Sequence, residues 1–484
     1  MRLTKSDYLR YLKCPRYAWV HKHNPTRIRH EKTLSGDHAQ NERDQLQRLA
    51  RRLFPGGQSV RSDNLDEAHR HTQELIASGA PAIFSATIVT PDLSATTDVL
   101  HKTDAGWDII SIQSAGSVHQ KHLSDLAFQK HVWRQADLVI SRLQIGHINK
   151  AYVRGSHLNP KELITITDVT ATVPEIDQDV ASIRDYVLAT SEPTTTCAHP
   201  RSCPMPDICW SDLPTYSIYD IPRLTADKIN QLRSRQIINV RDVPDDAQLS
   251  PKQRLQVQLA QANRVLIDHE RLASALNQLN YPLYFLDYEA FGPAIPELPG
   301  YQPYQHLVFQ YSLHVIAHPE AEFEHKSFLS RDFATATEQV AASLRQNIGP
   351  QGHIVVWHKT FETQRHIEMG RLYPKHAEFM TQLNDRIFDL RDVFEHQLYI
   401  DPRFRGGTSI KNILPILAPE LSYKQLPIRE GTEAAAQWYL MVRGNLPLDK
   451  QERIYTNLAR YCYLDTLAMV KIFENLTKLA PTTA

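Results

Sequence analysis

The feature that most constrains this chain is an apolar run that ends in two acidic residues. Leu283–Leu286 has the length and composition of a buried strand, and Asp287 and Glu289 follow it directly. Because successive side chains of a strand point to opposite faces, these two carboxylates are expected on the same face of a sheet. The sequence therefore predicts a pair of carboxylates presented together by a central strand.

Two later segments carry further acidic residues in suitable places. Ile354–Phe361 has the pattern of a strand that runs into the start of a helix, and Glu362 follows it. Tyr461 and Asp465 are four residues apart, which places them side by side on a helix. An Asp-x-Glu pair alone arises by chance, and a Tyr/Asp pair on a helix is usually a surface pair. The order and spacing of the motifs nevertheless favour a site in which four acids from three elements hold two cations.

The ligand types indicate which cations and which substrate the site would bind. Carboxylate oxygens are hard donors, which suit Mg²⁺ or Mn²⁺. Downstream, Arg405, Ser409 and Lys411 flank or follow a Gly-Gly pair that allows a close backbone approach to a phosphate. We expect these three residues to contact substrate, and we expect Asp389 to be a loop or cap residue.

The overall charge gives no field that would attract nucleic acid to the whole chain. Lys and Arg number 54, as do Asp and Glu, so any such binding must rely on local patches. No run approaches the roughly 18 apolar residues of a membrane span, and the N-terminus lacks the apolar core of a signal peptide. We therefore expect a cytoplasmic protein with no membrane partner.

The length of 484 residues exceeds one ordinary core, so two or three domains are expected. Residues 1–215 have the pattern of an α/β unit, 216–280 form a helical linker or small helical hairpin domain, and 281–484 alternate strands and helices in a second α/β fold. Within the first unit we expect strands near 83–89, 97–100 and 107–112, followed by a helix over 121–143.

The cysteines are few but clustered. Five in a chain of this size argue against a disulfide framework. Cys197, Cys203 and Cys209 are separated by five residues twice over in a proline-rich segment, so their thiolates can converge on one centre. Cys462 lies inside the last acidic motif and is expected to be a small core residue.

The order of the acidic motifs resembles the DEDD exonucleases of the RNase H-like superfamily, which include polymerase proofreading domains. Asp287 and Glu289 match the first motif of that family, and Asp465 matches its last acid. Glu362 stands where the second motif usually has an aspartate, one methylene shorter. Tyr461 matches the tyrosine that separates one branch from the histidine branch. The resemblance implies that these five residues are catalytic, that the four acids hold two Mg²⁺ or Mn²⁺ ions, and that Tyr461 orients the attacking water.

The cysteine pattern resembles the iron–sulfur members of the RecB-like, or PD-(D/E)xK, nuclease family. That resemblance makes Cys14, Cys197, Cys203 and Cys209 the four ligands of a 4Fe–4S cluster, with a zinc ion as the alternative. Such a cluster would tie together the two ends of the N-terminal domain.

The catalytic pattern of the same family is incomplete in this chain. Asp98 matches its first acid, Gln129 its helix glutamine and His38 its histidine, but Ser111 and Gln113 stand where Glu and Lys are needed. Without them the module lacks a metal ligand and the cation that steadies the transition state. We therefore expect the N-terminal module not to cut, and to bind nucleic acid through local Lys and Arg side chains.

Together the two resemblances span nearly the whole chain, and they look like a bacterial family in which a cysteine-clustered RecB-like module precedes an RNase H-like DEDD domain. The implied function is a divalent-metal-dependent 3′→5′ exonuclease acting on DNA or RNA, in which the C-terminal domain cuts and the N-terminal iron–sulfur module binds the strand. The alternative is a non-catalytic nucleic-acid-binding or interaction protein built from degenerate nuclease folds.

Overall fold

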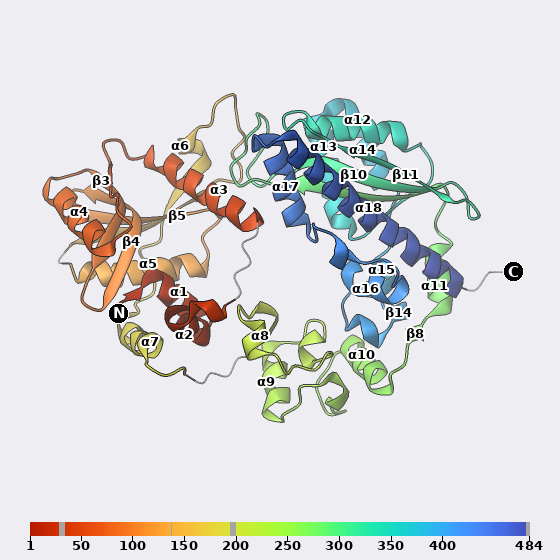
Figure 1. Cartoon of the computed structure of the whole chain (residues 1–484), viewed down its shortest axis with the longest axis horizontal. Coiled ribbons are helices and arrows are strands. Elements are labelled where there is room, and N and C mark those ends of the chain that lie inside the picture. The colour runs from red at the N-terminus through yellow and green to blue at the C-terminus, as the bar shows by residue number, and fades with distance from the viewer. Residues whose placement is uncertain (29–33, 137, 194–199, 481–484) are drawn as a thin grey trace. The chain divides into compact units, whose positions relative to one another are not determined.

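The chain divides into two compact α/β units (Figure 1). The computed structural model describes residues 1–28, 34–136, 138–193 and 200–480. Unit 1 comprises residues 1–197, 202–209 and 292–305, and unit 2 comprises residues 198–201, 210–291 and 306–484. None of the helices described is both long enough and apolar enough to cross a membrane. The α/β class expected from the sequence is confirmed for both units.

Unit 1 is built on a seven-stranded sheet of order β2-β3-β4-β5-β6-β7, with β1 also paired to β4. Its strands are β1 (Leu3–Thr4), β2 (Gln58–Ser59), β3 (Ala82–Val89), β4 (Leu93–Thr103), β5 (Gly106–Gln113), β6 (Ile140–Ile148) and β7 (Ile164–Asp168). Its α-helices are α1 (Lys5–Lys13), α2 (Pro15–His23), α3 (Leu34–Arg51), α4 (Leu65–Ala77), α5 (Gln120–Arg134), α6 (Pro160–Leu163), α7 (Asp177–Leu188) and α8 (Pro206–Cys209). The antiparallel meander β3-β4-β5 confirms the three strands predicted in this region.

The long helix predicted over residues 121–143 is wrong at its C-terminal end. Helix α5 stops at Arg134, and β6 begins at Ile140. In β6 the side chains of Leu143 and Ile145 enter one core and Ile148 enters the core on the other face, as the alternation of side chains along a strand requires. Parallel pairing with β5 gives this backbone its hydrogen bonds, so tertiary pairing overrides the apolar pattern that suggested a continuing helix.

Unit 2 holds a five-stranded sheet of order β11-β10-β9-β12-β13, in which β9, β10 and β11 are antiparallel and β12 and β13 run parallel to β9. Its strands are β9 (Leu283–Phe291), β10 (Leu307–Ile316), β11 (Phe323–Leu329), β12 (His353–Val356) and β13 (Ile387–Asp389), and β8 (Leu266–Ile267) pairs separately with β14 (Tyr399–Ile400). Its α-helices are α9 (Ala226–Ser234), α10 (Pro251–Ala262), α11 (His269–Leu276), α12 (Ala336–Asn347), α13 (Lys359–Leu372), α14 (Ala377–Asn384), α15 (Asp392–Glu395), α16 (Ile410–Leu417), α17 (Gly431–Arg443) and α18 (Leu448–Leu479). The acid-bearing strand β9 is therefore the centre of the sheet.

The two faces of β9 enter two different cores. Tyr284, Leu286 and Tyr288 pack with side chains of α12, α13 and α14. Leu283 and Phe285 pack with side chains of α11, α16 and α18. Because side chains alternate along a strand, Asp287 and Glu289 continue the second series and lie on the α18 face.

Polar contacts with β10 fix the position of α18 along the sheet. The side-chain amide of Gln310 donates to the Leu458 carbonyl at 3.0 Å. The hydroxyl of Thr466 lies 2.7 Å from the Ser312 hydroxyl and 2.8 Å from His314 Nδ1. Thr466 is fully buried, so these contacts hold the middle of α18 against the sheet, and Asp465 is the residue just before Thr466 on this helix.

Candidate metal centre

Two of the four predicted acids of unit 2 lie within metal-ligand distance of each other, and the charges of the other two act on them. One ligand atom from each of Asp287, Glu289 and Cys462 falls within 4.8 Å of the others. Burial raises the pKa of Asp287 well above its ordinary value, and the negative charges of Asp465, Glu289 and Glu362 raise it further. Burial and the charge of Asp465 likewise raise the pKa of Glu289. The structure thus brings together carboxylates from β9, α13 and α18.

The other two acids also have raised pKa values. Burial raises the pKa of Asp465 to about 7, against the opposing effects of a hydrogen bond from Tyr423 and the charge of Lys411. Burial raises the pKa of Glu362 to about 8, and the neighbouring charge of Asp389 adds to the shift. Without a cation, several of these carboxyls hold protons near neutral pH. A divalent ion would displace those protons and favour the charged forms.

The environment of Glu362 fits a cation site. This side chain is only 2% exposed, and its Oε2 atom has no hydrogen-bond partner among the residues that the structure describes. Buried polar atoms are almost always paired, so an unpaired carboxylate oxygen whose charge acts on Asp287 is suited to a metal ligand. The donor set is dominated by hard oxygens, which fits Mg²⁺ or Mn²⁺.

Two tyrosines and a lysine border the acids. The hydroxyl of Tyr423 donates to Asp465 Oδ1 at 2.6 Å, and its ring centroid lies 6.3 Å from that of Tyr461. Burial and the charge of Asp465 raise the pKa of Tyr461, so this phenol stays protonated. The ammonium group of Lys411 donates to the Arg429 carbonyl at 2.5 Å, and its charge lowers the pKa values of Glu289 and Asp465. The predicted Lys411 is therefore at the site, as is Tyr423, which the sequence did not indicate.

The other two predicted substrate contacts have structural partners. Arg405 donates to the carbonyl of Thr215 at 3.1 Å. Ser409 is the N-cap of α16, where its hydroxyl accepts from the backbone of Lys411 at 3.3 Å. Both side chains belong to exposed residues, so they remain open to solvent beside these contacts.

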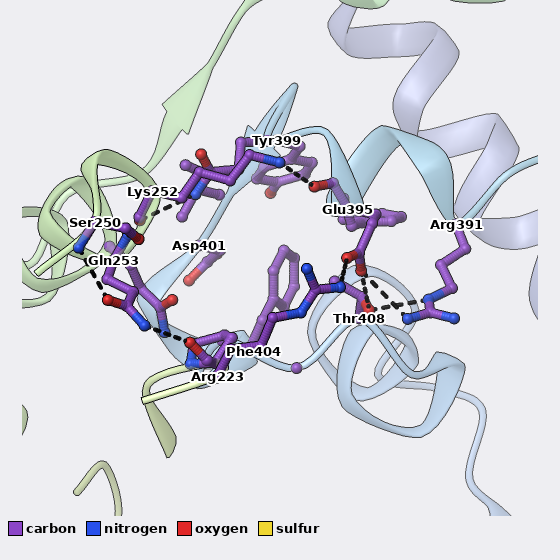
Figure 2. A pocket seen from close by; sticks show the side chains of 17 residues that line it. Arg223, Ser250, Lys252, Gln253, Arg391, Glu395, Tyr399, Asp401, Phe404 and Thr408 are labelled. Atoms are coloured by element: carbon purple, nitrogen blue, oxygen red, sulfur yellow. Dashed lines mark hydrogen bonds and ion pairs between the residues drawn. The ribbon is translucent and has the colours of Figure 1, made fainter. Parts of the chain in front are cut away.

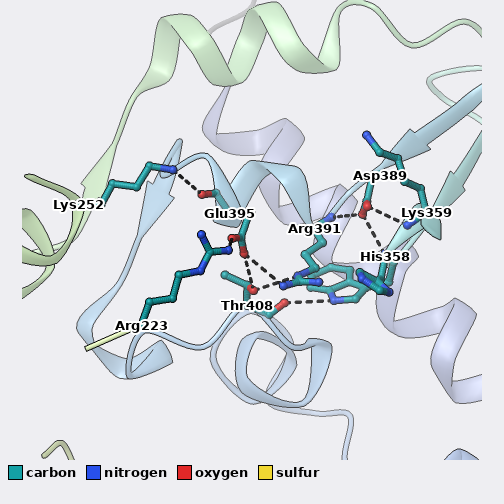
Figure 3. A network of polar contacts seen from close by, with 9 residues as sticks. Arg223, Lys252, His358, Lys359, Asp389, Arg391, Glu395 and Thr408 are labelled. Carbon is teal, nitrogen blue, oxygen red and sulfur yellow. Dashed lines mark hydrogen bonds and ion pairs between the residues drawn. The ribbon is translucent and has the colours of Figure 1, made fainter. Parts of the chain in front are cut away.

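Asp389 confirms the expectation that it is a cap residue (Figure 3). Its Oδ1 atom accepts from the backbone N–H groups of His358 at 3.0 Å and Arg391 at 3.1 Å. Its Oδ2 atom accepts from the backbone of Lys359 at 2.8 Å. These bonds hold the first turn of α13, and Glu362 belongs to that turn. Asp389 therefore positions one of the four acids.

Cys462 is a core residue, as expected, but it also lies beside the acids. It is fully buried, and its sulfur is 4.0 Å from Asp287 Oδ2. The charges of Asp287 and Glu289 add to burial in raising the pKa of this thiol. A thiol at this position adds one softer atom to a site of hard oxygens.

Three of the four cysteines of the N-terminal pattern gather in unit 1. Burial and the charges of Cys203 and Cys14 raise the pKa of Cys209. The sulfur of Cys209 accepts from Arg16 Nη1 at 3.5 Å, and that of Cys203 accepts from the backbone of Met205 at 3.4 Å. Cys197 lies outside the described residues. The described thiols of the pattern therefore lie near enough to one another for their charges to act on Cys209.

Asp98, the predicted first acid of the RecB-like pattern, has protein partners. It accepts from the backbone of Ile112 at 2.7 Å, from the side-chain amide of Gln47 at 3.0 Å and from the Ser111 hydroxyl at 3.4 Å. Ser111 occupies the place expected for glutamate. The contacts of Asp98 are therefore those of a structural carboxylate.

Asp125 completes this network and was not indicated by the sequence. It accepts from Gln129 at 2.8 Å, from the Ser111 hydroxyl at 3.1 Å and from Gln113 at 3.4 Å. Lys5 forms an ion pair with it at 3.4 Å. The predicted residues Gln129, Ser111 and Gln113 are thus brought together, but around Asp125.

His38 lies on α3, the helix that also carries Gln47, one of the donors to Asp98. Its Nε2 atom is 3.9 Å from Glu42 Oε1. The same Glu42 oxygen accepts from the backbone of Ala294 at 2.7 Å. His38 therefore sits next to the contact that holds residues 292–305 in unit 1.

Comparison with known proteins gives a match for part of the chain. A family model described as Domain of unknown function (DUF2779) matches residues 284–409. The matched stretch begins in β9 and ends just before α16, so it includes Asp287, Glu289 and Glu362 but stops short of α18. No curated protein and no solved structure matches the chain. The central part of unit 2 is therefore similar to DUF2779.

Proposed function

We propose that the chain is a divalent-metal-dependent 3′→5′ exonuclease that acts on DNA or RNA, with its catalytic site in unit 2. The observation that supports the proposal is the pair Asp287 and Glu289, whose ligand atoms lie within 4.8 Å of each other and of Cys462, with the charges of Asp465 and Glu362 acting on Asp287. A mixed five-stranded sheet with the first two acids on its central strand agrees with the RNase H-like fold expected from the motifs.

The residues of the site have distinct roles in this proposal. Two Mg²⁺ or Mn²⁺ ions, once bound by the four acids, would lower the pKa of the attacking water and stabilise the leaving 3′ oxygen. The phenol of Tyr461, which keeps its proton, orients that water by a hydrogen bond. The ammonium group of Lys411 neutralises the phosphate. The water oxygen bonds to phosphorus as the bond to the 3′ oxygen breaks, which releases a 5′-mononucleotide and a strand with a new 3′ hydroxyl.

The test is an assay of the full chain on end-labelled strands with Mn²⁺. A 5′-labelled DNA or RNA strand should shorten in steps, and a 3′-labelled strand should yield a labelled mononucleotide. Asp287→Ala and Asp465→Ala should each abolish this activity. Asp449→Ala, at an exposed acid in the first turn of the same helix as Asp465, is the matched control and should leave the activity unchanged. Full turnover in both acid variants would refute the proposal.

We further propose that unit 1 is a RecB-like module that holds a 4Fe–4S cluster and binds the strand without cutting it. The gathering of Cys14, Cys203 and Cys209 supports the cluster. The hydrogen bonds that Asp98 accepts from protein donors support the lack of cutting. Anaerobically purified protein should be brown with broad visible absorbance, and Cys203→Ser should be colourless. If the purified protein instead contained one zinc ion per chain and no iron, the zinc alternative would hold and the 4Fe–4S cluster would be refuted.

A second candidate is a non-catalytic nucleic-acid-binding protein. The observation that favours it is the closed network of unit 1, where Ser111 and Gln113 replace the catalytic pair and hydrogen-bond to Asp125. It predicts that labelled strands bind to the chain but survive in Mg²⁺ and in Mn²⁺. Hydrolysis that Asp287→Ala abolishes would eliminate this candidate.

A further inference from the structure

A second recess in unit 2 lies outside the acid cluster (Figure 2). It is a cavity of about 360 Å³, with walls from Pro222–Gln256 on one side and Arg391–Thr408 on the other. The described residues that line it include none of the four acids. Its volume lies in the range of small-ligand sites, about 300–1,000 Å³.

One wall of this cavity is aromatic. Phe394 and Phe404 meet edge to face with centroids 5.6 Å apart, and Tyr399 lies 5.4 Å from Phe404. All three residues are at most 6% exposed, so the rings are fixed by their neighbours and only a small part of each ring borders the cavity. A rigid wall of this kind suits a planar aromatic ring, because ring–ring contacts add to the gain from apolar burial.

The opposite side carries an arginine that makes few contacts within the protein. The Arg223 side chain is 89% exposed. Within the described chain its one recorded partner is Glu395, with 3.5 Å from Nη2 to Oε1. Most of its five N–H donors therefore face solvent, in the fork geometry that matches a phosphate. Lys252 is exposed nearby, and its ammonium group approaches the Glu395 carbonyl at 3.4 Å.

The cavity carries an excess of positive charge. Glu395 is shared between Arg223 and Arg391, with 3.2 Å from Arg391 Nη2 to Glu395 Oε2 (Figure 3). The other lining acid, Asp401, is balanced by Arg403, which contacts both of its oxygens at 3.0 Å. Because Asp401 and Arg403 neutralise each other, the remaining charged side chains of the lining are the cations Arg223, Lys252 and Arg391 and the anion Glu395. Their net charge is two positive charges.

The walls are held in place before any ligand binds. Gly406 has a φ of +65°, and a Cβ there would lie 2.8 Å from the Asp220 carbonyl, so only glycine lets the two walls pack this closely. Gln397 donates to the Lys252 carbonyl at 3.2 Å, which ties the walls together. A preformed cavity lowers the cost of ordering on binding.

We infer that this cavity binds one nucleotide, with its base against the apolar side that the borders of Phe394 and Phe404 help to line and its phosphate at Arg223 and Lys252. The aromatic wall favours a base-bearing ligand over a simple anion, and the positive charge favours a nucleotide over a neutral nucleoside. The inference goes beyond the proposed function, because binding here needs neither the four acids nor hydrolysis. Two sources share this chemistry, a free 5′-mononucleotide and a nucleotide unit of a single strand.

The experiment is calorimetric titration of the full chain in EDTA, in an Asp287→Ala background that prevents turnover. The ligands are 5′-dAMP, 5′-AMP, a five-nucleotide oligomer and inorganic phosphate. At least one nucleotide ligand should bind, and Arg223→Glu should weaken it at least about tenfold, because a charge-assisted contact becomes a repulsive one. Arg235→Glu is the matched control, since Arg235 is a half-exposed arginine of the same unit paired with Asp246, and it should leave the affinity unchanged.

Binding of the mononucleotides with this dependence on Arg223 would assign a free nucleotide, and binding of the oligomer alone would assign a unit of a strand. Both results support the inference. Absence of binding, binding that survives Arg223→Glu, or phosphate binding as tightly as 5′-dAMP would overturn it. A chain that binds nucleotide in this way but fails the hydrolysis assay would refute the exonuclease proposal alone.

Discussion

At the scale of single residues, Tyr423 is the clearest addition to the predicted site. Its hydroxyl donates to Asp465 Oδ1 at 2.6 Å, so it orients one of the four acids. Tyr423→Phe should raise the Mn²⁺ concentration needed for half-maximal activity by about 10–100-fold, the usual effect of losing a group that orients a metal ligand. The activity at saturating Mn²⁺ should fall much less. Metal titrations of the exonuclease rate measure both quantities.

The control for this prediction is Tyr455→Phe, which removes a hydroxyl from α18 beside Arg331. It should leave the metal dependence unchanged. Equal metal dependence in Tyr423→Phe and wild type would show that Tyr423 does not position Asp465.

Glu362 gives a prediction for pH dependence. Its pKa is raised to about 8, whereas an unfolded glutamate titrates near 4.3, so in metal-free protein the folded state holds more protons between these values. Folding stability from this group is therefore present at low pH and lost as pH rises through about 8. Glu362→Gln, which cannot ionise, should gain stability over wild type as pH rises from about 4 to 8, by about 1–3 kcal/mol, and the two proteins should differ least at about pH 4.

Urea unfolding in EDTA at the two pH values measures this difference. At pH 8, saturating Mn²⁺ should make the wild type more stable than Glu362→Gln, because the ion stabilises the charged carboxylate of the wild type. A pH-independent difference between the two proteins would contradict the assigned pKa shift.

The residues found from the sequence share one property, which is a position inside a regular element. Asp287 and Glu289 end an apolar run, and Tyr461 and Asp465 keep helical spacing, so periodicity places all four. Tyr423 belongs to a three-residue 3-10 helix, where no periodic pattern exists. Its approach to Asp465 depends on tertiary packing over 42 residues of chain, which no local pattern encodes.

At the scale of elements, the start of α13 depends on Asp389. The helix begins at Lys359 after His358, whose φ of +82° is unusual for a residue with a Cβ, and Asp389 accepts from the backbone of both. Asp389→Ala should lower the free energy of unfolding by about 1–2 kcal/mol, as for loss of a helix cap, and should lower the exonuclease rate because Glu362 shifts. Urea unfolding and the end-label assay measure the two effects.

Asp389→Asn is the conservative counterpart, since its amide oxygen still accepts from one backbone N–H group. It should recover part of both losses. Unchanged stability in Asp389→Ala would mean that the first turn of α13 is held by other contacts.

The elements themselves were predictable to differing degrees. The strand at 283–286 and the helix around 461–465 were correct, because each has an unbroken apolar period. The helix predicted over 121–143 was correct as far as Arg134 and wrong beyond it, because β6 has a strand pattern only once the parallel partner β5 is known. Local patterns therefore suffice for elements with a clear period and fail where pairing decides the structure.

At the scale of the whole molecule, the chain does not divide into simple consecutive pieces. Residues 292–305, between β9 and β10, belong to unit 1, while both strands belong to unit 2. The proline- and glycine-containing sequence of this segment marks a loop, but it gives no sign of which unit the loop packs in. Only tertiary contacts such as that of Glu42 with Ala294 assign it.

Because each unit has its own core, the chain should unfold in two thermal transitions. Cys203→Ser should lower the midpoint temperature of only one transition, because this cysteine lies with Cys14 and Cys209 in unit 1. A thiolate-held metal centre stabilises the fold that contains it. Cys462→Ser changes a fully buried cysteine of unit 2 and is the matched control. It should lower the midpoint temperature of only the other transition. Differential scanning calorimetry separates the two effects, and a chelator added to wild type should reproduce the effect of Cys203→Ser on its own transition. A single transition that both variants lower equally would show that the two units unfold as one cooperative body.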